Sequence, residues 1–82
     1  MKPLDKGYVV DVCVELGFYE SGDMNPDTCK YEHHEFATHD KALAAARRLL
    51  PRDKFGEVAV MPFVRDKYGI DYDWDNREIV YK

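Results

Sequence analysis

Apolar and polar side chains alternate along the first part of the chain. Between residues 8 and 18 every second position is apolar: Tyr8, Val10, Val12, Val14, Leu16 and Phe18. Since a β-strand points successive side chains to opposite faces, this pattern predicts a long antiparallel-type strand with one buried face. Residues 20–28 are rich in turn formers and predict a loop, after which residues 30–37 can return as a second strand.

A hairpin of these two strands predicts which side chains lie opposite one another. If the first strand ends near residue 19 and the second begins near residue 30, Cys13 pairs with about Ala37. The same register places Glu15 almost opposite Glu35 on the outer face, on which Asp11 also lies. Like charges in such positions destabilise a sheet, so their presence favours a surface that binds a basic partner, although a register slip of two residues would also separate them.

The strongest helical pattern spans residues 38–51. Its apolar side chains share an arc of about 160°, and they are Ala42, Leu43, Ala45, Ala46, Leu49 and Leu50. Thr38 or Asp40 can cap the start of this helix. Arg47 and Arg48 suit the negative end of the helix dipole, and Pro51 ends the helix. We therefore expect one helix whose apolar face packs on the sheet.

The last third of the chain predicts further strands. Residues 57–64 are apolar on both faces, which is typical of a covered central strand. Pro62 has no N–H to donate, so this strand needs a bulge or a free edge at that point. A turn at residues 66–69 leads into the next strand, and residues 79–81 form a last strand after a second turn.

Residues 70–75 alternate large apolar side chains with carboxylates. The carboxylates are Asp71, Asp73 and Asp75, and the apolar side chains are Ile70, Tyr72 and Trp74. A strand here would turn the apolar side chains towards a core and set the aspartates in a row on the other face. Same-face residues of a strand lie roughly 6.5 to 7 Å apart, close to the spacing of phosphates along one nucleic-acid strand. The row therefore suggests mimicry of nucleic acid, and the solvated face of a one-sided sheet is the alternative explanation.

The order of these elements is strand, strand, helix, strand, strand. It predicts a single two-layer α+β domain over residues 1–82, with an antiparallel sheet of four to five strands and one helix packed on one face. Eighty-two residues leave room for one small core. No stretch approaches the ~18 apolar residues of a membrane span and no targeting segment is recognised, so we expect a cytoplasmic protein that does not bind membranes.

The charge balance narrows the class of partner. Sixteen acidic side chains against 12 basic ones give a net charge of −4, which argues against direct binding to nucleic acid. It favours a basic or nucleic-acid-binding protein as the partner, although the same charge also simply keeps a small protein in solution.

Six tyrosines add a second kind of contact. Tyr19, Tyr31 and Tyr68 are the three that we expect to be partly exposed. A tyrosine beside acidic side chains can form hydrogen bonds and stack against arginine, so these three join the candidate partner-binding residues. The alternative is that all six complete a small core.

Candidate metal ligands are present but poorly spaced. Cys29, His33, His34 and His39 lie within eleven residues and are of the types that zinc prefers. On a strand the two adjacent histidines point to opposite faces, and Cys29 lies about 13 Å from His33. We therefore expect no metal site and no cofactor.

The two cysteines and Ser21 give no catalytic pattern. In the hairpin described above, Cys13 and Cys29 lie roughly 25 Å apart, so both thiols are expected to be free. Cys13 is in mid-strand, Ser21 is in a loop, and no glycine-rich phosphate cradle accompanies a basic residue. The sequence thus predicts a protein that is not an enzyme.

The layout resembles a known kind of small protein. An acidic chain of about eighty residues, in which residues 36–38 lead into the alanine-rich helix face of Ala42, Ala45, Ala46 and Leu49, is similar to small phage-encoded accessory proteins, anti-CRISPR proteins among them. The resemblance implies an inhibitor or modulator that acts stoichiometrically, without a cofactor, in the bacterial cytoplasm. It would occlude a basic nucleic-acid-binding surface of a host nuclease or nucleoprotein complex.

Two other functions stay open from the sequence. One is a self-associating structural or accessory subunit, monomeric or homodimeric, that buries the strand edge at residues 79–81 and the tyrosines. The other is a small zinc-binding regulator that uses Cys29 and the histidines.

Overall fold

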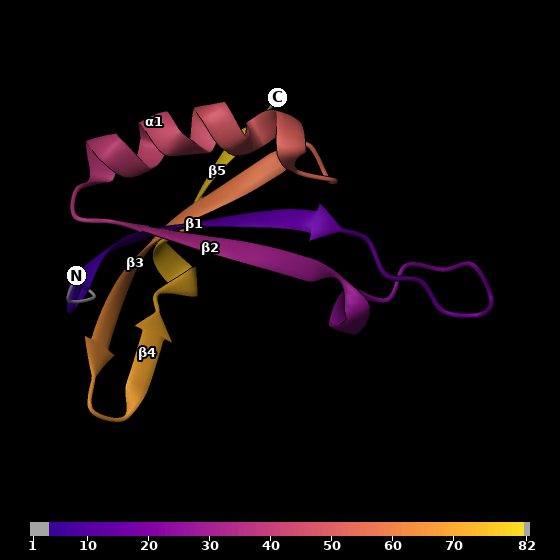
Figure 1. Ribbon diagram of the computed structural model, residues 1–82, viewed down its shortest axis with the longest axis horizontal. Helices are drawn as coiled ribbons and strands as arrows, with labels where there is room; N and C mark the ends of the chain where they lie inside the picture. Colours follow the sequence, from indigo (N-terminus) through magenta and orange to yellow (C-terminus); the bar gives the residue numbers. More distant parts are fainter. Residues whose placement is uncertain (1–3, 82) are drawn as a thin grey trace.

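The computed structural model describes residues 4–81 as one helix packed on a sheet of five strands (Figure 1). Residues 1–3 and 82 of the predicted domain range lie outside this part. The elements are β1 (Lys6–Glu15), β2 (Lys30–Phe36), α1 (His39–Leu49), β3 (Glu57–Asp66), β4 (Gly69–Tyr72) and β5 (Glu78–Tyr81). Three short 3-10 helices, Pro26–Thr28, Leu50–Arg52 and Trp74–Asn76, lie between them. The predicted two-layer α+β fold is confirmed.

The sheet is antiparallel throughout, with the strand order β2–β1–β3–β4. Both β4 and β5 pair with β3, on the edge that does not face β1. β4 pairs with the second half of β3 and β5 with its first half. The prediction that β3 is a covered central strand is therefore confirmed.

Pro62 explains why two strands share that edge. The carbonyl of Pro62 accepts a hydrogen bond of 2.9 Å from the backbone N–H of Asp73, but its nitrogen has no hydrogen to offer in return. It lies between the parts of β3 that pair with β5 and with β4. The irregularity expected at Pro62 is therefore the break between β5 and β4 on one edge of β3. On the other edge, pairing with β1 continues without a bulge.

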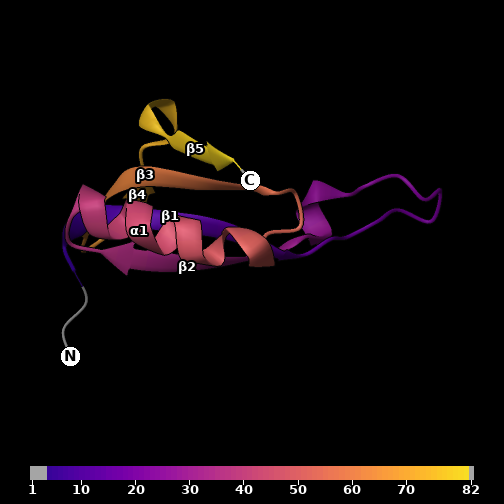
Figure 2. The same ribbon diagram turned by 90° about the horizontal axis from the view of Figure 1, so that it is seen from above.

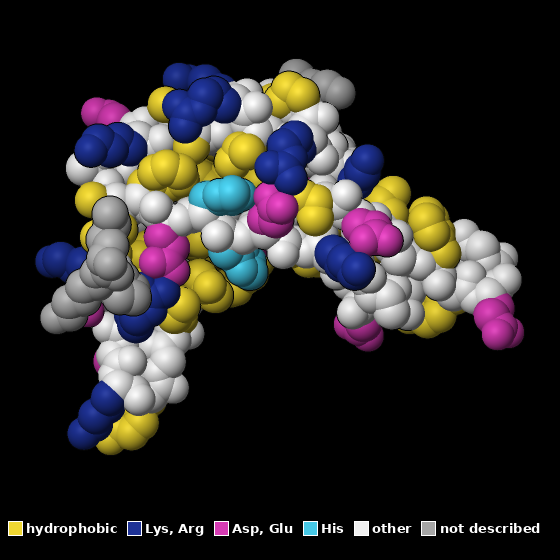
Figure 3. All heavy atoms as spheres, viewed as in Figure 1, with side chains coloured by type: hydrophobic (Ala, Val, Ile, Leu, Met, Phe, Trp, Pro, Cys, Tyr) yellow, Lys and Arg dark blue, Asp and Glu magenta, His cyan; other side chains and the backbone are white. Residues whose placement is uncertain are grey.

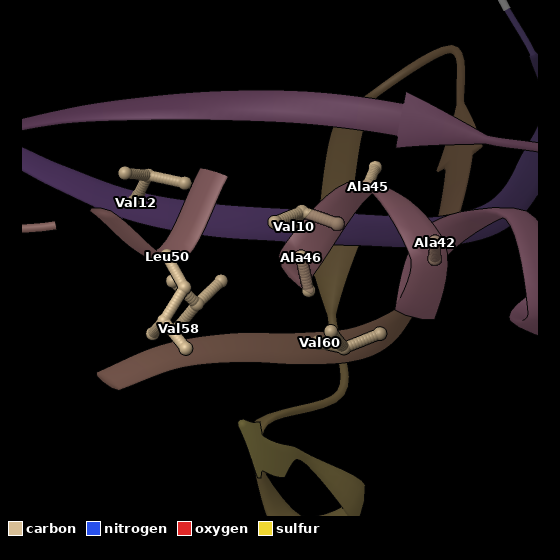
Figure 4. Packing of buried hydrophobic residues seen from close by; sticks show 8 residues of the cluster. All are labelled: Val10, Val12, Ala42, Ala45, Ala46, Leu50, Val58 and Val60. Atoms are coloured by element: carbon tan, nitrogen blue, oxygen red, sulfur yellow. The ribbon is translucent and has the colours of Figure 1, made fainter. Parts of the chain in front are cut away.

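The helix packs one face onto the sheet, across β1 and its neighbours (Figure 2). Of the two residues expected to cap it, Thr38 does so, because its hydroxyl accepts a hydrogen bond of 3.3 Å from the backbone N–H of Lys41. The closed core beneath the helix, shown in Figure 4, consists of Val10, Val12, Ala42, Ala45, Ala46, Leu50, Val58 and Val60. Alanine side chains on the helix let its backbone lie close to the valines of β1 and β3.

The opposite face of the sheet also buries apolar side chains. Val9, Met61 and Phe63 are almost fully buried there, and Tyr72 of β4 packs against them. The expectation of one buried face on the first strand is therefore wrong. The reason is that Leu4, before β1, and Tyr72, on β4, cover these side chains on that side.

The predicted register of the first hairpin is also wrong. β1 ends at Glu15, and Cys13 pairs with Tyr31 in place of Ala37. The chain between β1 and β2 is a long loop with its own bridge between Phe18 and Met24, so it does not act as a tight hairpin turn. Phe18, expected to be buried, is 59% exposed.

This register separates the two glutamates that were expected to face each other. Glu15 lies opposite Lys30, with 3.3 Å between its carboxylate and the ammonium nitrogen. Two nitrogen atoms of Arg65 hold the Glu35 carboxylate. The prediction of a like-charged pair is wrong, because each glutamate has a basic partner supplied by another strand.

The predicted strand over residues 70–75 ends early. β4 stops at Tyr72, and the chain then turns through the 3-10 helix Trp74–Asn76. The Asn76 side chain donates a hydrogen bond of 2.8 Å to the Asp73 carboxylate, a local contact that competes with strand pairing. The row of Asp71, Asp73 and Asp75 on one strand face is therefore wrong.

The part of the chain that the structure describes contains no helix with the length and apolar character of a membrane span.

Candidate functional site

A cavity of about 510 Å³ lies on the sheet face opposite α1. In Figure 3 the molecule is hollowed on this lower side, between the β3–β4 hairpin and the β1–β2 loop. Asp11 and Cys13 of β1 and Ala59 of β3 form its floor. The walls come from β2, from the segment between α1 and β3 with the first residue of β3, and from β5 with the segment before it: Tyr31, His33, Asp53, Phe55, Glu57, Trp74, Arg77 and Ile79.

Asp53 fixes the wall between α1 and β3. Its side chain is buried, and one oxygen accepts a hydrogen bond of 2.8 Å from the backbone N–H of Cys13. The other oxygen accepts from the backbone N–H groups of Phe55 and Glu57, at 2.8 and 3.3 Å. These three donors stabilise the carboxylate and hold Phe55 beside the cavity.

Asp11 is placed very differently from Asp53. Its side chain is only 10% exposed, and its Oδ1 atom lies 3.2 Å from Nε2 of His33. That contact lacks the geometry of a hydrogen bond, and no donor among the described residues serves Oδ1. Burial raises the pKa of Asp11; His33 opposes this effect and the nearby Asp53 adds to it.

His33 is held in place by an aromatic neighbour. Its ring lies 5.3 Å from the ring of Tyr72, centre to centre, with an angle of 35° between the planes. Since Tyr72 packs on the buried Phe63 and Met61, the position of the imidazole is set by the second apolar cluster. Asp11 is thus fixed by its place on β1, and the His33 ring is fixed by β2 and by Tyr72 of β4.

Both cysteines are free, as expected, and both are buried. They lie close to each other, which was not expected. Cys29 comes two residues before Tyr31, the strand partner of Cys13, so the separation of roughly 25 Å is wrong. Burial raises the pKa of the Cys13 thiol; the Glu15 carbonyl opposes this effect and Cys29 adds to it. A thiol with a raised pKa stays protonated at neutral pH and is a weak nucleophile.

Three aromatic side chains surround the opening of the cavity. Tyr31, Phe55 and Trp74 are 43%, 42% and 48% exposed, so each keeps one part packed and presents another to solvent. Aromatic faces attract cations and stack on planar groups. Beside carboxylates they form an environment that suits a positively charged ligand.

One arginine also lines this cavity. A nitrogen of the Arg77 guanidinium donates a hydrogen bond of 2.8 Å to the backbone carbonyl of Trp74, which fixes it beside the chain. The opposite side of the molecule is more basic, since Lys41, Arg47 and Arg48 are exposed on α1. Dark blue groups of lysine and arginine lie over this helix in Figure 3. The two sides of the sheet therefore differ in charge.

The structure brings together only part of the predicted partner-binding set. Asp11 and Tyr31 line the cavity, and Asp73 and Asp75 flank Trp74 at its edge. Asp71 is exposed on β4. The remaining four members lie elsewhere or already have a partner, and they are Glu15, Glu35, Tyr19 and Tyr68.

The expected exposure of three tyrosines is confirmed, since Tyr19, Tyr31 and Tyr68 are all exposed. Sequence reasoning missed Phe55, Glu57 and Trp74 as surface groups. Phe55 is a lone aromatic between a lysine and a glycine, a context typical of a loop, and this signal could have marked it.

The histidines do not share a site. Their Nε2 atoms contact three different carboxylates: His33 contacts Asp11 at 3.2 Å, His34 contacts Glu32 at 3.2 Å and His39 contacts Glu78 at 3.0 Å. The pairing of β1 with β2 puts His33 and His34 on opposite faces, as predicted. Within residues 4–81 no group of three histidine, cysteine or acidic side chains could hold a metal ion.

Comparison with known proteins found no match: no protein-family model, no curated protein and no solved structure matches this chain. What the chain does is therefore inferred from its own residues.

Proposed function

We propose that this chain is a non-enzymatic inhibitor or modulator, encoded by a phage or mobile element, that binds a host protein. It occludes a basic nucleic-acid-binding surface of a nuclease or nucleoprotein complex. The observation that carries this proposal is Trp74, an exposed tryptophan between Asp73 and Asp75 at the edge of the cavity. Tryptophan is enriched among the residues that dominate binding energy at protein interfaces.

The surroundings of Trp74 support a basic partner. Asp71, Asp73 and Asp75 are all exposed, and Glu57 adds a fourth exposed carboxylate at the cavity wall. Carboxylates around an aromatic centre favour a positively charged surface and speed its approach. The sequence suggested a row of aspartates on one strand as a mimic of phosphate charge. We propose instead that residues 71–75, here called the acidic segment, carry this mimicry without forming a single strand.

The test is an affinity capture from bacterial lysate with the tagged chain, washed at low and at high salt, followed by mass spectrometry. We expect a nuclease or nucleic-acid-binding protein that is lost at high salt, because exposed charges are screened within about 10 Å at 0.1 M salt. Purified partner mixed with the chain should then release its nucleic acid.

A matched pair of variants locates the binding surface. D71N/D73N/D75N and the control E20Q/D23N/D27N each remove three exposed carboxylates, so each changes the net charge from −4 to −1. Only the first should lose the partner. Equal capture by both variants would contradict the proposal, and the absence of any partner together with a concentration-dependent dimer in light scattering would favour the self-associating subunit.

A further inference from the structure

The cavity on the open sheet face contains a carboxylate whose own chain does not satisfy it. Asp11 is nine-tenths buried, and its Oδ1 atom accepts no hydrogen bond from the described residues. Its contact with His33 at 3.2 Å is an electrostatic one. A buried carboxylate without donors is destabilised by the loss of water, and a donor that arrives with a ligand offsets this loss.

The second carboxylate in the cavity, that of Asp53, has hydrogen-bond donors for both of its oxygens. Asp53 accepts three backbone hydrogen bonds and links β1 to the start of β3. Asp53 therefore has a structural role, and its hydrogen bonds are already used within the chain. Asp11 lies on the same floor without such donors, so its side chain is the one that is available to a ligand.

The walls around Asp11 match the shape and chemistry of a planar cation. Tyr31, Phe55 and Trp74 come from three separate segments, and each exposes part of its ring at the opening. A guanidinium group stacks on aromatic faces and donates several hydrogen bonds in one plane, whereas an ammonium is a compact, strongly hydrated charge. The only lysine or arginine among the described residues that line the cavity is Arg77, and it is fixed to the carbonyl of Trp74.

We propose that this cavity receives the guanidinium group of an arginine side chain that belongs to the bound partner protein. The guanidinium donates to the Asp11 carboxylate and stacks between the rings of Trp74 and its aromatic neighbours. This inference rests on the proposed function, because the partner surface that the chain would occlude is basic. A volume of about 510 Å³ leaves room for the side chain together with part of the flanking peptide.

The test is a titration of the ¹⁵N-labelled chain, followed by NMR, with N-acetyl-arginine methylamide as the probe. We expect saturable shifts at the amides of Asp11 and His33 and at the indole N–H of Trp74. The neutral analogue, N-acetyl-citrulline methylamide, and the lysine analogue should each bind at least several-fold more weakly, because one lacks the charge and the other the planar donor set.

Two variants test the residues named. Asp11→Asn keeps the shape of the side chain and removes its charge, and it should weaken binding of the arginine probe by at least about tenfold. Trp74→Ala removes the stacking surface and should weaken binding as well. The control is Asp40→Asn, which makes the same change of charge on the helix side and should bind the probe like the unaltered chain.

Several results would overturn the proposal: no saturable shift, equal binding of citrulline or lysine analogue, or unchanged binding by Asp11→Asn. Tighter binding of free L-arginine than of the blocked probe would overturn the assignment to a partner side chain in favour of a small-molecule ligand. If the arginine probe fails while D71N/D73N/D75N still loses the captured partner, the proposed function stands and only the cavity assignment falls.

Discussion

The two faces of the sheet use the same strands in opposite ways. Under α1, the valines of β1 and β3 meet the alanines of the helix and close a core without polar groups (Figure 4). On the other face, Asp11 and Cys13 of β1 lie at the bottom of a cavity with an exposed aromatic rim. The alternation of side chains along one strand thus places a closed core on one face and a cavity on the other.

The open face has its own means of support. Val9, Met61 and Phe63 form a second apolar cluster beside the cavity, and Asp53 links its wall to β1 through backbone hydrogen bonds. The base of the cavity is therefore packed and hydrogen-bonded, and we expect its exposed side chains to add little to stability. This difference predicts that mutations on the two faces separate stability from binding.

The largest loss of stability is expected on the helix side. Leu50→Ala removes a buried side chain from the closed core and should lower the free energy of unfolding by about 2 to 5 kcal/mol. Urea denaturation followed by circular dichroism measures it. A loss below 1 kcal/mol, on the order of a surface substitution, would show that this core does not hold the fold.

The next largest effect is expected at the base of the cavity. Asp53→Ala leaves the buried N–H of Cys13 without an acceptor and frees Phe55 and Glu57, which should lower the free energy of unfolding by about 1 to 3 kcal/mol. Asp53→Asn keeps one oxygen and should cost less. Equal stability of the alanine variant and the unaltered chain would rule out this structural role.

A smaller loss of stability is expected at the rim, together with a large loss of binding. Trp74→Ala should lower the free energy of unfolding by only about 1 kcal/mol, because the side chain is half exposed. The same variant should fail to capture the basic partner at low salt. Retained capture by a folded Trp74→Ala chain would break the distinction between the faces.

The smallest expected effect is a pH dependence from Asp11. Burial raises the pKa of Asp11 in the folded state above the ordinary value of 3.8. The folded chain therefore holds this proton more tightly than the unfolded chain does, and the free energy of unfolding falls as the pH rises from 3.8 through the raised pKa. Asp11→Asn removes the titrating group and with it this contribution to the pH dependence of stability. The stability of the variant relative to the unaltered chain should therefore increase over this pH range.

Urea denaturation of both proteins at a series of pH values checks this prediction. His33 and Asp53 are the titratable side chains that act on Asp11, and both are kept in the variant. A stability difference that does not change with pH, or that changes in the opposite direction, would contradict the burial of the charged carboxylate.

Local patterns were enough to predict the helix and the central strand. The helix follows from the spacing of its alanines and leucines and from Thr38 as its cap, all within one stretch of chain. The register of β1 and β2 depends on the length of the loop between them and on Arg65, which takes the carboxylate of Glu35 from another strand. The end of β4 depends on Pro62 in the neighbouring strand. Such distant causes leave no periodic signal in the sequence.

The candidate site shows the same limit. Asp11 and Tyr31 could be named from the sequence, because acidic and tyrosine side chains are candidates wherever they are exposed. The cavity that contains them also takes Phe55 and Trp74 from segments far apart in the chain. Trp74 was expected in the core because of its alternation with aspartates, and only the break after Tyr72 places it at the surface.

The central claim is that the open face, and not the helix face, binds the partner. The chain has a single tryptophan, so incorporation of 5-fluorotryptophan gives one ¹⁹F signal that reports on Trp74 alone. On addition of the captured partner at low salt, this signal should shift or broaden until the chain is saturated, and it should recover at high salt. Binding that is detected by light scattering while the ¹⁹F signal stays unchanged would contradict the claim.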